Sequence, residues 1–275
     1  MKLSRTLGSL VGATALTFSL VACSSTDGEG DDKTIKVGVS PGPYSVLFQD
    51  GIEPILTEEG YTIEYTNFSD LQQATTAVQE GAVDLNVDQH TAYMEVFNRE
   101  RGADLDSFTE IPTVPAGLYS EKYTSLDEVA DGQSVGIPTD ASNQSRAYNI
   151  LADAGWITLR EGADPALLTE NDIEDNPHNL DIQVMDSATI PRALTDLDWG
   201  VIPGSMSYAS NVDPNLQLFQ EDLRPELILV AVTRADEIDS EWTTAVADAY
   251  RNPEFHEFLD EENVNNYWFV PDSIK

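Results

Sequence analysis

The sequence predicts an α/β protein with mixed, mostly parallel sheets, and three observations support this prediction. Short apolar runs rich in β-forming residues alternate along the chain with longer amphipathic segments. Strands separated by helices pair mainly in parallel, and helices then cover both faces of the sheet. The chain from Lys33 to Lys275 is long for one domain and natural for two, so we expect two such sheets.

The predicted strands are short apolar runs that follow polar residues or turns. Each contains β-branched or aromatic residues and is only four to seven residues long, as is typical of strands buried on both faces. In chain order the predicted strands are 35–39, 61–65, 83–87, 134–137, 180–184, 199–202 and 227–233.

The predicted helices lie between these strands, and their apolar residues repeat at helical spacing. Thr91, Ser142 and Ser240 are the expected N-caps of three of them, while Gly102 and Gly155 mark two helix ends. In chain order the predicted helices are 45–59, 69–81, 91–102, 142–155, 190–197, 240–250 and one that begins at Pro253, with a capping box at 125–128.

The first residues form a processing signal rather than part of the fold. Met1–Arg5 is short and positively charged, and Leu7–Ala22 is apolar apart from Gly, Ser and Thr. This apolar stretch is shorter, and richer in small residues, than a membrane span of about 20 residues. Residues 1–22 therefore predict a secretory signal peptide that is removed.

The signal ends in Leu20-Val21-Ala22-Cys23, which resembles the bacterial lipobox. The Cys23 sulfur is expected to carry a diacylglycerol and to anchor the chain at the extracytoplasmic face of the cell membrane, at roughly 0.8 kcal/mol per buried CH2. The alternative is a chance cysteine in an ordinary signal peptide. Residues 23–33 predict a polar tether, and the mature domain has no internal disulfide because Cys23 is the only cysteine.

The chain is strongly acidic, with 49 Asp and Glu against 14 Lys and Arg and a formal net charge of −35. This charge argues against nucleic acid as a partner and against electrostatic binding to anionic lipid. Because the acidic residues are spread along the chain, they indicate a solvated acidic surface; a dedicated cation-binding surface is the alternative.

The loops after the predicted strands are the expected functional region, because ligands of open α/β sheets bind beyond the carboxyl ends of the strands. The loop 138–146 runs from a strand into a helix, whose N-terminus offers free N–H groups and a partial positive charge. Arg146 lies one turn further and can bind a carboxylate with two hydrogen bonds. The alternative is an ordinary capped helix with a solvated Arg146.

Two further strand ends carry polar or aromatic side chains. His90 and Tyr93 follow the strand 83–87, where His90 could hydrogen-bond a ligand and Tyr93 could form a pocket wall; the alternatives are a structural histidine and a core tyrosine. After the strand 199–202, Pro203-Gly204 forces a turn, for which a purely structural role is the alternative.

Signatures of catalysis and of metal binding are absent from the sequence. It contains no Gly-rich phosphate loop, no Gly-x-Ser-x-Gly and no His-Glu-x-x-His. His90, His178 and His256 occur singly, without the spacing of metal ligands. We therefore expect neither an enzyme nor a cofactor.

Several tracts of the chain, in their order and spacing, resemble the methionine-binding lipoprotein family of ABC importers, the NlpA type. Any one tract is weak, but together they extend from the lipobox to about residue 250. The tracts are 35–39, 88–93, 117–122, 125–128, 137–140, Asn143 with Arg146, 176–180 and 190–194.

The resemblance implies a type II periplasmic-binding-protein fold, in which two α/β lobes are joined by a hinge and hold the ligand between them. The first lobe would comprise residues 34–118 and 228–275, and the second 119–227. The implied ligand is methionine or a related amino acid or short peptide, and the implied partner is an ABC permease in the membrane. The protein is expected to be a monomer without a cofactor.

The resemblance also implies roles for four residues. Arg146 would bind the ligand carboxylate with Asn143 nearby, and His90 and Tyr93 would face the ligand from the other lobe.

Three positions differ from the family's pattern. Asp88 and Val114 stand where aromatic residues are usual, and Pro203-Gly204 replaces an Asn that meets the ligand's amino group. Asp88 could bind a positive or polar group, and Ser205 beside Gly204 could replace the lost amide, so Asp88, Gly204 and Ser205 join the predicted site. The alternatives are a binding protein for a different ligand, a surface interaction lipoprotein without a small ligand, and an enzyme on the same fold.

Overall fold

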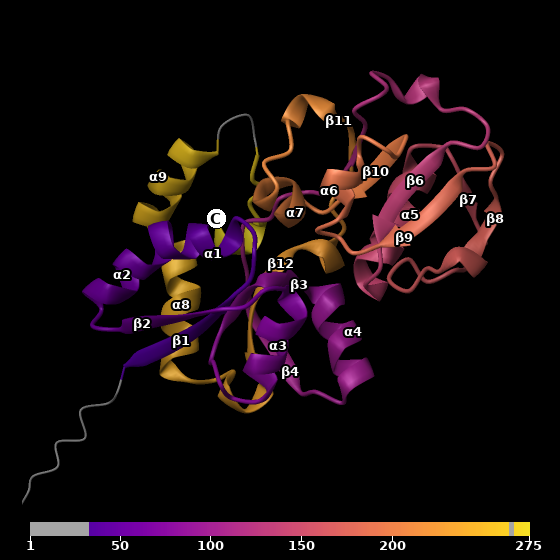
Figure 1. Ribbon diagram of the computed structural model, residues 1–275. Coiled ribbons are helices and arrows are strands. Elements are labelled where there is room, and N and C mark those ends of the chain that lie inside the picture. Colours follow the sequence, from indigo (N-terminus) through magenta and orange to yellow (C-terminus); the bar gives the residue numbers. More distant parts are fainter. Residues whose placement is uncertain (1–32, 264–266) are drawn as a thin grey trace, which may run out of the picture. The chain divides into compact units, whose positions relative to one another are not determined.

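The computed structural model describes residues 33–263 and 267–275 (Figure 1). The predicted signal peptide, Cys23 and the predicted tether up to residue 32 lie outside the described residues. Within the described ranges, no helix is long and apolar enough to cross a membrane.

Five strands from the two ends of the chain lie together. They are β1 (Thr34–Val39), β2 (Thr62–Asn67), β3 (Asn86–His90), β4 (Leu105–Glu110) and β12 (Leu229–Arg234). β1 pairs with β2 in parallel, and a parallel bridge from Val37 to Leu85 joins β1 to the residue before β3. β12 lies between β3 and β4 and is antiparallel to both. The spatial order is therefore β2-β1-β3-β12-β4, in which β12 alone runs in the opposite direction.

The middle of the chain forms the five-stranded main sheet. Its strands, in spatial order, are β11 (Gln217–Gln220), β5 (Gly117–Tyr119), β10 (Trp199–Ile202), β6 (Ser134–Pro138) and β9 (Asp181–Met185). β6 pairs in parallel with β9 and with β10, whereas β5 is antiparallel to β10 and to β11. Four strands of the main sheet therefore share one direction and only β5 opposes them.

The two strand arrangements have the same topology. In each arrangement we number the four strands of shared direction in chain order. The first of these four lies between the second and the third, and the single opposed strand separates the third from the fourth. β6 and β10 are consequently the equivalents of β1 and β3. The loops after these four strands emerge at carboxyl ends of parallel strands, where ligands of α/β sheets bind.

The helices connect these strands and cover their faces (Figure 1). α3 and α4 pack against the strands β3, β4 and β12, and α5 packs against β6. The helices are α1 (Tyr44–Leu47), α2 (Glu53–Glu58), α3 (Leu71–Gln79), α4 (Thr91–Arg101), α5 (Ala141–Asp153), α6 (Ile190–Ala193), α7 (Gly204–Ala209), α8 (Glu241–Arg251) and α9 (Pro253–Glu262).

Short elements complete the described chain. β7 (Thr158–Leu159) and β8 (Ile173–Asp175) form an antiparallel pair. The 3-10 turns are Leu126–Glu128, Glu170–Asp172, Pro214–Leu216, Pro225–Leu227, Ala235–Glu237 and Asp272–Ile274.

A π-helical turn, η1 (Phe48–Ile52), joins α1 to α2, so the predicted helix 45–59 is one helical run with a widened middle turn. At its centre, a Cβ on Gly51 would lie 2.7–2.9 Å from the rings of Phe255 and Phe258. Only glycine leaves room for this close approach of α9.

Separate apolar cores lie beneath the two sheets. One contains the first strands with α1, α2, α8 and α9, and another contains β6, β10 and α5. In the second core the fully buried Trp199 stacks on Tyr123, with ring centroids 4.7 Å apart, and meets Trp156 edge-on. Burying aromatic rings supplies a large part of the stability of a core of this kind.

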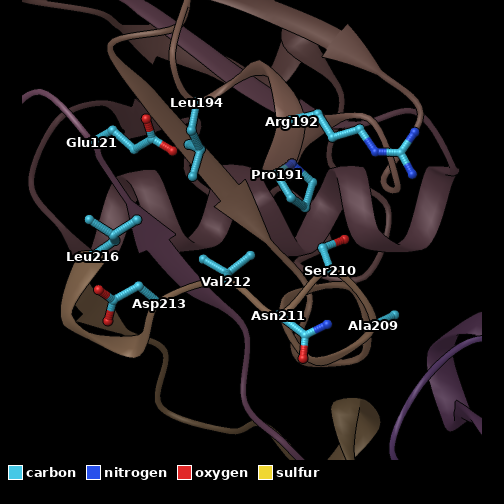
Figure 2. Close-up of a pocket in the computed structure, with 10 residues that line it drawn as sticks. All are labelled: Glu121, Pro191, Arg192, Leu194, Ala209, Ser210, Asn211, Val212, Asp213 and Leu216. Atoms are coloured by element: carbon cyan, nitrogen blue, oxygen red, sulfur yellow. The ribbon is translucent and has the colours of Figure 1, made fainter.

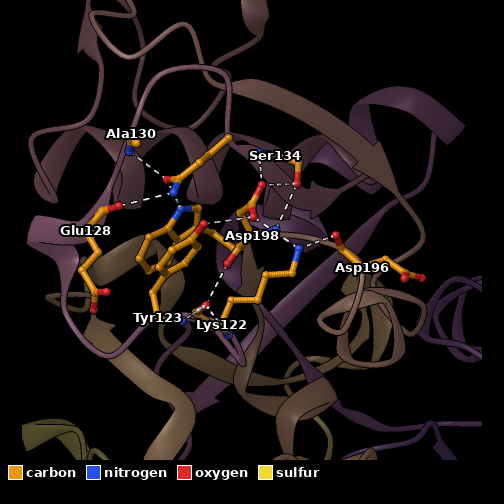
Figure 3. A network of polar contacts seen from close by, with 10 residues as sticks. Lys122, Tyr123, Glu128, Ala130, Ser134, Asp196 and Asp198 are labelled. Carbon is orange, nitrogen blue, oxygen red and sulfur yellow. Dashed lines mark hydrogen bonds and ion pairs between the residues drawn. The ribbon is translucent and has the colours of Figure 1, made fainter.

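Polar contacts fasten the start of β10 to the preceding loops of the same half (Figure 3). The Asp198 carboxylate accepts hydrogen bonds from the backbone N–H and the hydroxyl of Ser134, and it pairs with Lys122 at 3.2 Å. Hydrogen bonds from Ser134 and Lys122 more than offset the effect of burial, so the pKa of Asp198 is lowered. This network holds β6 and β10 in register.

The structure confirms most of the predicted elements and corrects two caps. The predicted Ser240 N-cap and the capping box of Ser125 and Glu128 are present. Thr91 and Ser142, however, are not caps: His90 caps α4 and Asp140 caps α5. Both errors arise because a residue one or two positions before the expected cap offers an acceptor in the right place.

Other elements differ in extent from the prediction. The helix predicted over 190–197 has only four residues in α6. β4, β5, β7, β8 and β11 were not predicted, because they are short or lack a clear apolar pattern.

Candidate ligand-binding site

The guanidinium of Arg146 is buried, with only 4% of the residue exposed, and it is already paired. Its Nε donates to both carboxylate oxygens of Glu221, at 2.8 and 3.0 Å, and its Nη2 also contacts Glu221. Burial lowers the pKa of Arg146, but the Glu221 charge raises it by more, so Arg146 remains a cation. Its Nη1 faces the side-chain oxygen of Asn143 at 3.5 Å.

Glu221, which follows β11, was not predicted as a site residue. It is 5% exposed, and its carboxylate also accepts the backbone N–H of Ala116 at 2.6 Å. In a chain with 49 acidic residues, nothing local distinguishes Glu221 from the others. Only its burial beside Arg146 does so.

His90 ends β3 and caps α4. Its Nδ1 accepts the backbone N–H of Tyr93 at 3.2 Å. Burial, followed by the positive charge of Arg146, lowers the pKa of His90 to about 3, so the ring is neutral at pH 7. Because Nδ1 is the acceptor, the proton resides on Nε2. That N–H is buried and makes no hydrogen bond of good geometry among the described residues, although the Asn143 side chain lies close enough to oppose part of the lowering of the His90 pKa.

Asp140 lies at the N-terminus of α5, where the sequence predicts an anion site. Its carboxylate accepts the backbone N–H of Asn143 at 2.9 Å and the side-chain amide of Asn143 at 3.1 Å. Burial raises the pKa of Asp140, and these hydrogen bonds oppose the shift. Asp140 therefore uses one of the N–H groups that the sequence offers to a ligand, and Arg146 is a further donor on α5.

Asp88 is buried on the same strand as His90. Its carboxylate accepts hydrogen bonds from Ser40 N–H at 2.8 Å, from the Ser40 hydroxyl at 3.1 Å, from the Ser45 hydroxyl at 2.7 Å and from the Asn86 amide at 3.3 Å. Burial raises the pKa of Asp88, while these donors oppose the shift. The carboxylate thus ties the loop after β1 to β3.

Tyr44 lies near the charged side chains of Arg146, Asp88 and Glu221. Its hydroxyl donates to the Val114 carbonyl at 3.4 Å and accepts the Val114 N–H at 3.3 Å. Burial raises the pKa of Tyr44, and the charges of Arg146, Asp88 and Glu221 all act on it. Residues from both sheets therefore converge around this hydroxyl.

Comparison with known proteins shows which family this chain belongs to. Residues 35–271 match the model of the NlpA lipoprotein family. The chain belongs to this family. It is 31% identical over 250 residues to the D-methionine-binding lipoprotein MetQ of Salmonella typhi, covering 90% of this chain and 91% of that protein. It is 30% identical to the membrane lipoprotein TpN32 of Treponema pallidum, covering 82% and 83%.

Solved structures show the same fold. A nutrient binding protein from Burkholderia cenocepacia bound to methionine superposes with a TM-score of 0.80 at 31% identity, covering 86% of this chain and 99% of that one. The substrate binding protein of a methionine transporter from Streptococcus pneumoniae superposes with a TM-score of 0.78 at 28% identity, covering 87% and 96%. These likenesses confirm the predicted α/β class with mixed sheets that are mostly parallel in the main sheet.

In this NlpA-family chain, Gly204 and Ser205 begin α7 and contact other elements. A Cβ on Gly204 would lie 2.5 Å from the Val114 carbonyl oxygen and 2.7 Å from the Val114 side chain. A Cβ on Gly42 would lie 3.1 Å from Ser205 Cβ. Two of the departures from the family pattern, Val114 and Gly204, therefore pack directly against each other.

Tyr93 lies on the first turn of α4 beside His90. Its ring meets the His90 ring edge-on, with centroids 6.4 Å apart. Burial raises the pKa of Tyr93, so its hydroxyl stays protonated at pH 7. The structure thus places Tyr93 next to His90, as the resemblance implies, while its contact with a ligand stays a prediction.

A separate hollow of about 440 Å³ lies on the main-sheet half (Figure 2). Its lining combines apolar side chains, such as those of Leu194 and Val212, with the charged side chains of Glu121, Arg192 and Asp213. None of the predicted site residues lines it. Within the described ranges, no group of three or more His, Cys, Asp or Glu side chains is arranged to hold a metal ion.

Proposed function

We propose that this chain is the substrate-binding lipoprotein of an ABC importer and that it captures methionine or a closely related amino acid or short peptide. The proposal is supported by membership of the NlpA family and by relatives that bind methionine. In this proposed role the protein makes and breaks no covalent bond, so its task is recognition of the ligand alone.

The observation that carries the proposal is the pair of donors that Arg146 and His90 contribute. The guanidinium keeps N–H groups that Glu221 does not use, and the His90 Nε2–H is buried and makes no hydrogen bond of good geometry among the described residues. A buried donor is costly unless it finds an acceptor. A ligand carboxylate supplies acceptors for both, and Asn143 lies beside them to complete the contact.

We further propose that the ligand closes two lobes, residues 34–118 with 228–275 and residues 119–227. The separate cores and the equivalent topology of the two sheets support this division. A ligand that contacts both His90 and Arg146 stabilises the closed form relative to the open form. The permease would then recognise the closed form.

The same proposal assigns the place of action to Cys23. A diacylglycerol on its sulfur would hold the protein, as a monomer, at the extracytoplasmic face of the membrane within reach of its permease. Membership of a lipoprotein family supports this anchor. Labelling with radioactive palmitate tests it, because a Cys23→Ala chain should carry no label.

A different ligand is the second candidate, and Asp88 favours it. Oδ1 of this buried carboxylate accepts one hydrogen bond, from Ser45, and can therefore accept another. A ligand with a polar or positively charged side chain would use this capacity, whereas a thioether would not.

Calorimetry on the purified chain distinguishes the two candidates. L-methionine, D-methionine, methionine dipeptides, and amino acids with basic or amide side chains are titrated separately. Micromolar binding of a methionine compound, weakened at least tenfold by Arg146→Ala, supports the proposal. Binding of a basic or amide amino acid alone, lost in Asp88→Asn, would establish the second candidate instead. Absence of binding by every compound would favour a surface interaction role.

A further inference from the structure

The Arg146 guanidinium has two edges that can each face a carboxylate, and Glu221 takes only one of them. Glu221 takes Nε and Nη2, which is the edge nearest the aliphatic stem. A guanidinium carries five N–H donors in a fixed plane. One N–H of Nη1 and the second N–H of Nη2 therefore form a fork on the other edge, and Nη1 also donates to the side-chain oxygen of Asn143 at 3.5 Å.

Glu221 is held in place independently of Arg146. Its carboxylate accepts the N–H of Ala116 at 2.6 Å, and its own N–H donates to the Ala116 carbonyl at 3.2 Å. Both residues are buried. The carboxylate is therefore fixed to the segment that leads into β5, and Arg146 is fixed to the carboxylate.

We infer that Glu221 is a positioning residue for recognition of the ligand carboxylate, acting through Arg146. By holding the stem-side edge, it orients the remaining fork of the guanidinium toward Asn143 and His90. This inference rests on the proposed function, because it names how the same site recognises its ligand.

A ligand carboxylate is not expected to displace Glu221. Displacement would leave a buried carboxylate and the Ala116 N–H without partners, both of which are costly. Binding at the other edge leaves the hydrogen bonds that join Glu221 to Arg146 and to Ala116 intact. The arrangement is thus a guanidinium between two carboxylates, one belonging to the protein and one to the ligand.

The test compares L-methionine with L-methioninamide, which keeps the side chain and the amino group but lacks the carboxylate charge. The dissociation constant of methioninamide divided by that of methionine, both measured by calorimetry on the full chain, reports carboxylate recognition alone. A smaller ratio means weaker recognition of the carboxylate. We expect Glu221→Gln to reduce this ratio at least tenfold, because Gln keeps the size of Glu but offers one acceptor in place of two. Glu221→Ala should reduce it further.

A double-mutant cycle separates positioning from general damage. Because Glu221 acts through Arg146, the chain with both Arg146→Ala and Glu221→Ala should show the same ratio as Arg146→Ala alone. This chain also avoids an unpaired buried charge, so it remains a usable reference if Glu221→Ala folds poorly. Asp198→Asn is the matched control, since it breaks a carboxylate network of the same half without touching Arg146 (Figure 3). It should lower the melting temperature and leave the ratio unchanged.

The outcomes are distinct. An unchanged or increased ratio in Glu221→Gln, with wild-type binding intact, overturns the positioning role but not the proposed function. Failure of the wild-type chain to bind methionine overturns the methionine assignment.

In that case the Nε–H proton resonance of Arg146, followed by NMR in the ligand-free chain, still tests whether Glu221 holds Arg146. It should exchange slowly with water in the wild type and quickly in Glu221→Gln, and equal exchange overturns the inference.

Discussion

At the scale of single residues, His90 combines a structural contact with a free donor. Its Nδ1 caps α4 by accepting the Tyr93 N–H, and this contact assigns the proton to Nε2. A lone histidine in a sequence is as compatible with a structural role as with a ligand contact. Here the structural contact itself prepares the ring to donate from its other nitrogen.

The depressed pKa of His90 makes stability depend on pH in a defined window. The unfolded chain protonates this histidine below pH ~6.5, whereas the folded chain keeps it neutral down to about pH 3. As pH falls through this window the unfolded state binds the extra proton, so stability falls by up to about 1.4 kcal/mol per pH unit.

Urea denaturation at pH 7, 6 and 5 checks this expectation. The matched variant is His90→Asn, because Asn also caps a helix N-terminus but does not titrate. The free energy of unfolding should fall more steeply in the wild type than in the variant between pH 6.5 and 5. Parallel pH profiles for the two chains would contradict the depressed pKa.

At the scale of elements, α5 shows why a cap must be assigned from geometry. The sequence offers both Asp140 and Ser142 near the start of this helix. Asp140 accepts the Asn143 N–H, while the Ser142 hydroxyl is buried without a hydrogen-bond partner among the described residues. A shift of two residues in the cap changes which side chain occupies the helix N-terminus.

This assignment predicts opposite results for two substitutions on the same turn. Asp140→Ala should lower the free energy of unfolding by about 1 kcal/mol, because it removes the cap of α5. Ser142→Ala should be neutral or slightly stabilising, because it removes a buried hydroxyl that lacks a partner. Thermal and urea unfolding of both variants provide the measurement. A larger loss in Ser142→Ala than in Asp140→Ala would show that Ser142 is the cap after all.

At the scale of the whole molecule, net charge dominates the solution behaviour. A formal charge of −35 spread over the chain causes self-repulsion that ions screen, with a Debye length of about 10 Å at 0.1 M salt. Among the described residues, most ion pairs lie at exposed or partly exposed positions, whereas the pair of Arg146 and Glu221 is buried. Surface pairs of this kind each contribute little.

We therefore expect the melting temperature to rise as NaCl increases from 0.1 to 1 M. The rise should depend on ionic strength and be equal for NaCl and KCl, because it reflects screening of repulsion. Differential scanning calorimetry with NaCl, KCl and low millimolar MgCl2 or CaCl2 measures it. A large stabilisation by a divalent cation at an ionic strength where NaCl has no effect would instead support a dedicated cation-binding surface.

Most of the fold could be predicted from the sequence because its signals are local. The strands β6, β10 and β12 are short apolar runs that are almost wholly buried, β1 buries every residue except Thr34 and Lys36, and the larger helices repeat apolar residues at helical spacing. β5 and β11 could not be predicted in this way. They are strands of three and four residues, whose hydrogen bonds depend on neighbours far along the chain.

The sequence by itself determined the α/β class and the family, and it pointed to Arg146 as a candidate site residue, because periodicity and motifs reside in neighbouring residues. The tertiary structure decided which partner Arg146 has. Glu221 lies 75 residues away, and only folding brings these charges together at a buried position. It also decided that Gly204 packs against Val114 and that Asp88 is already hydrogen-bonded. Contacts of this kind depend on distance in space, which the order of residues along the chain does not specify.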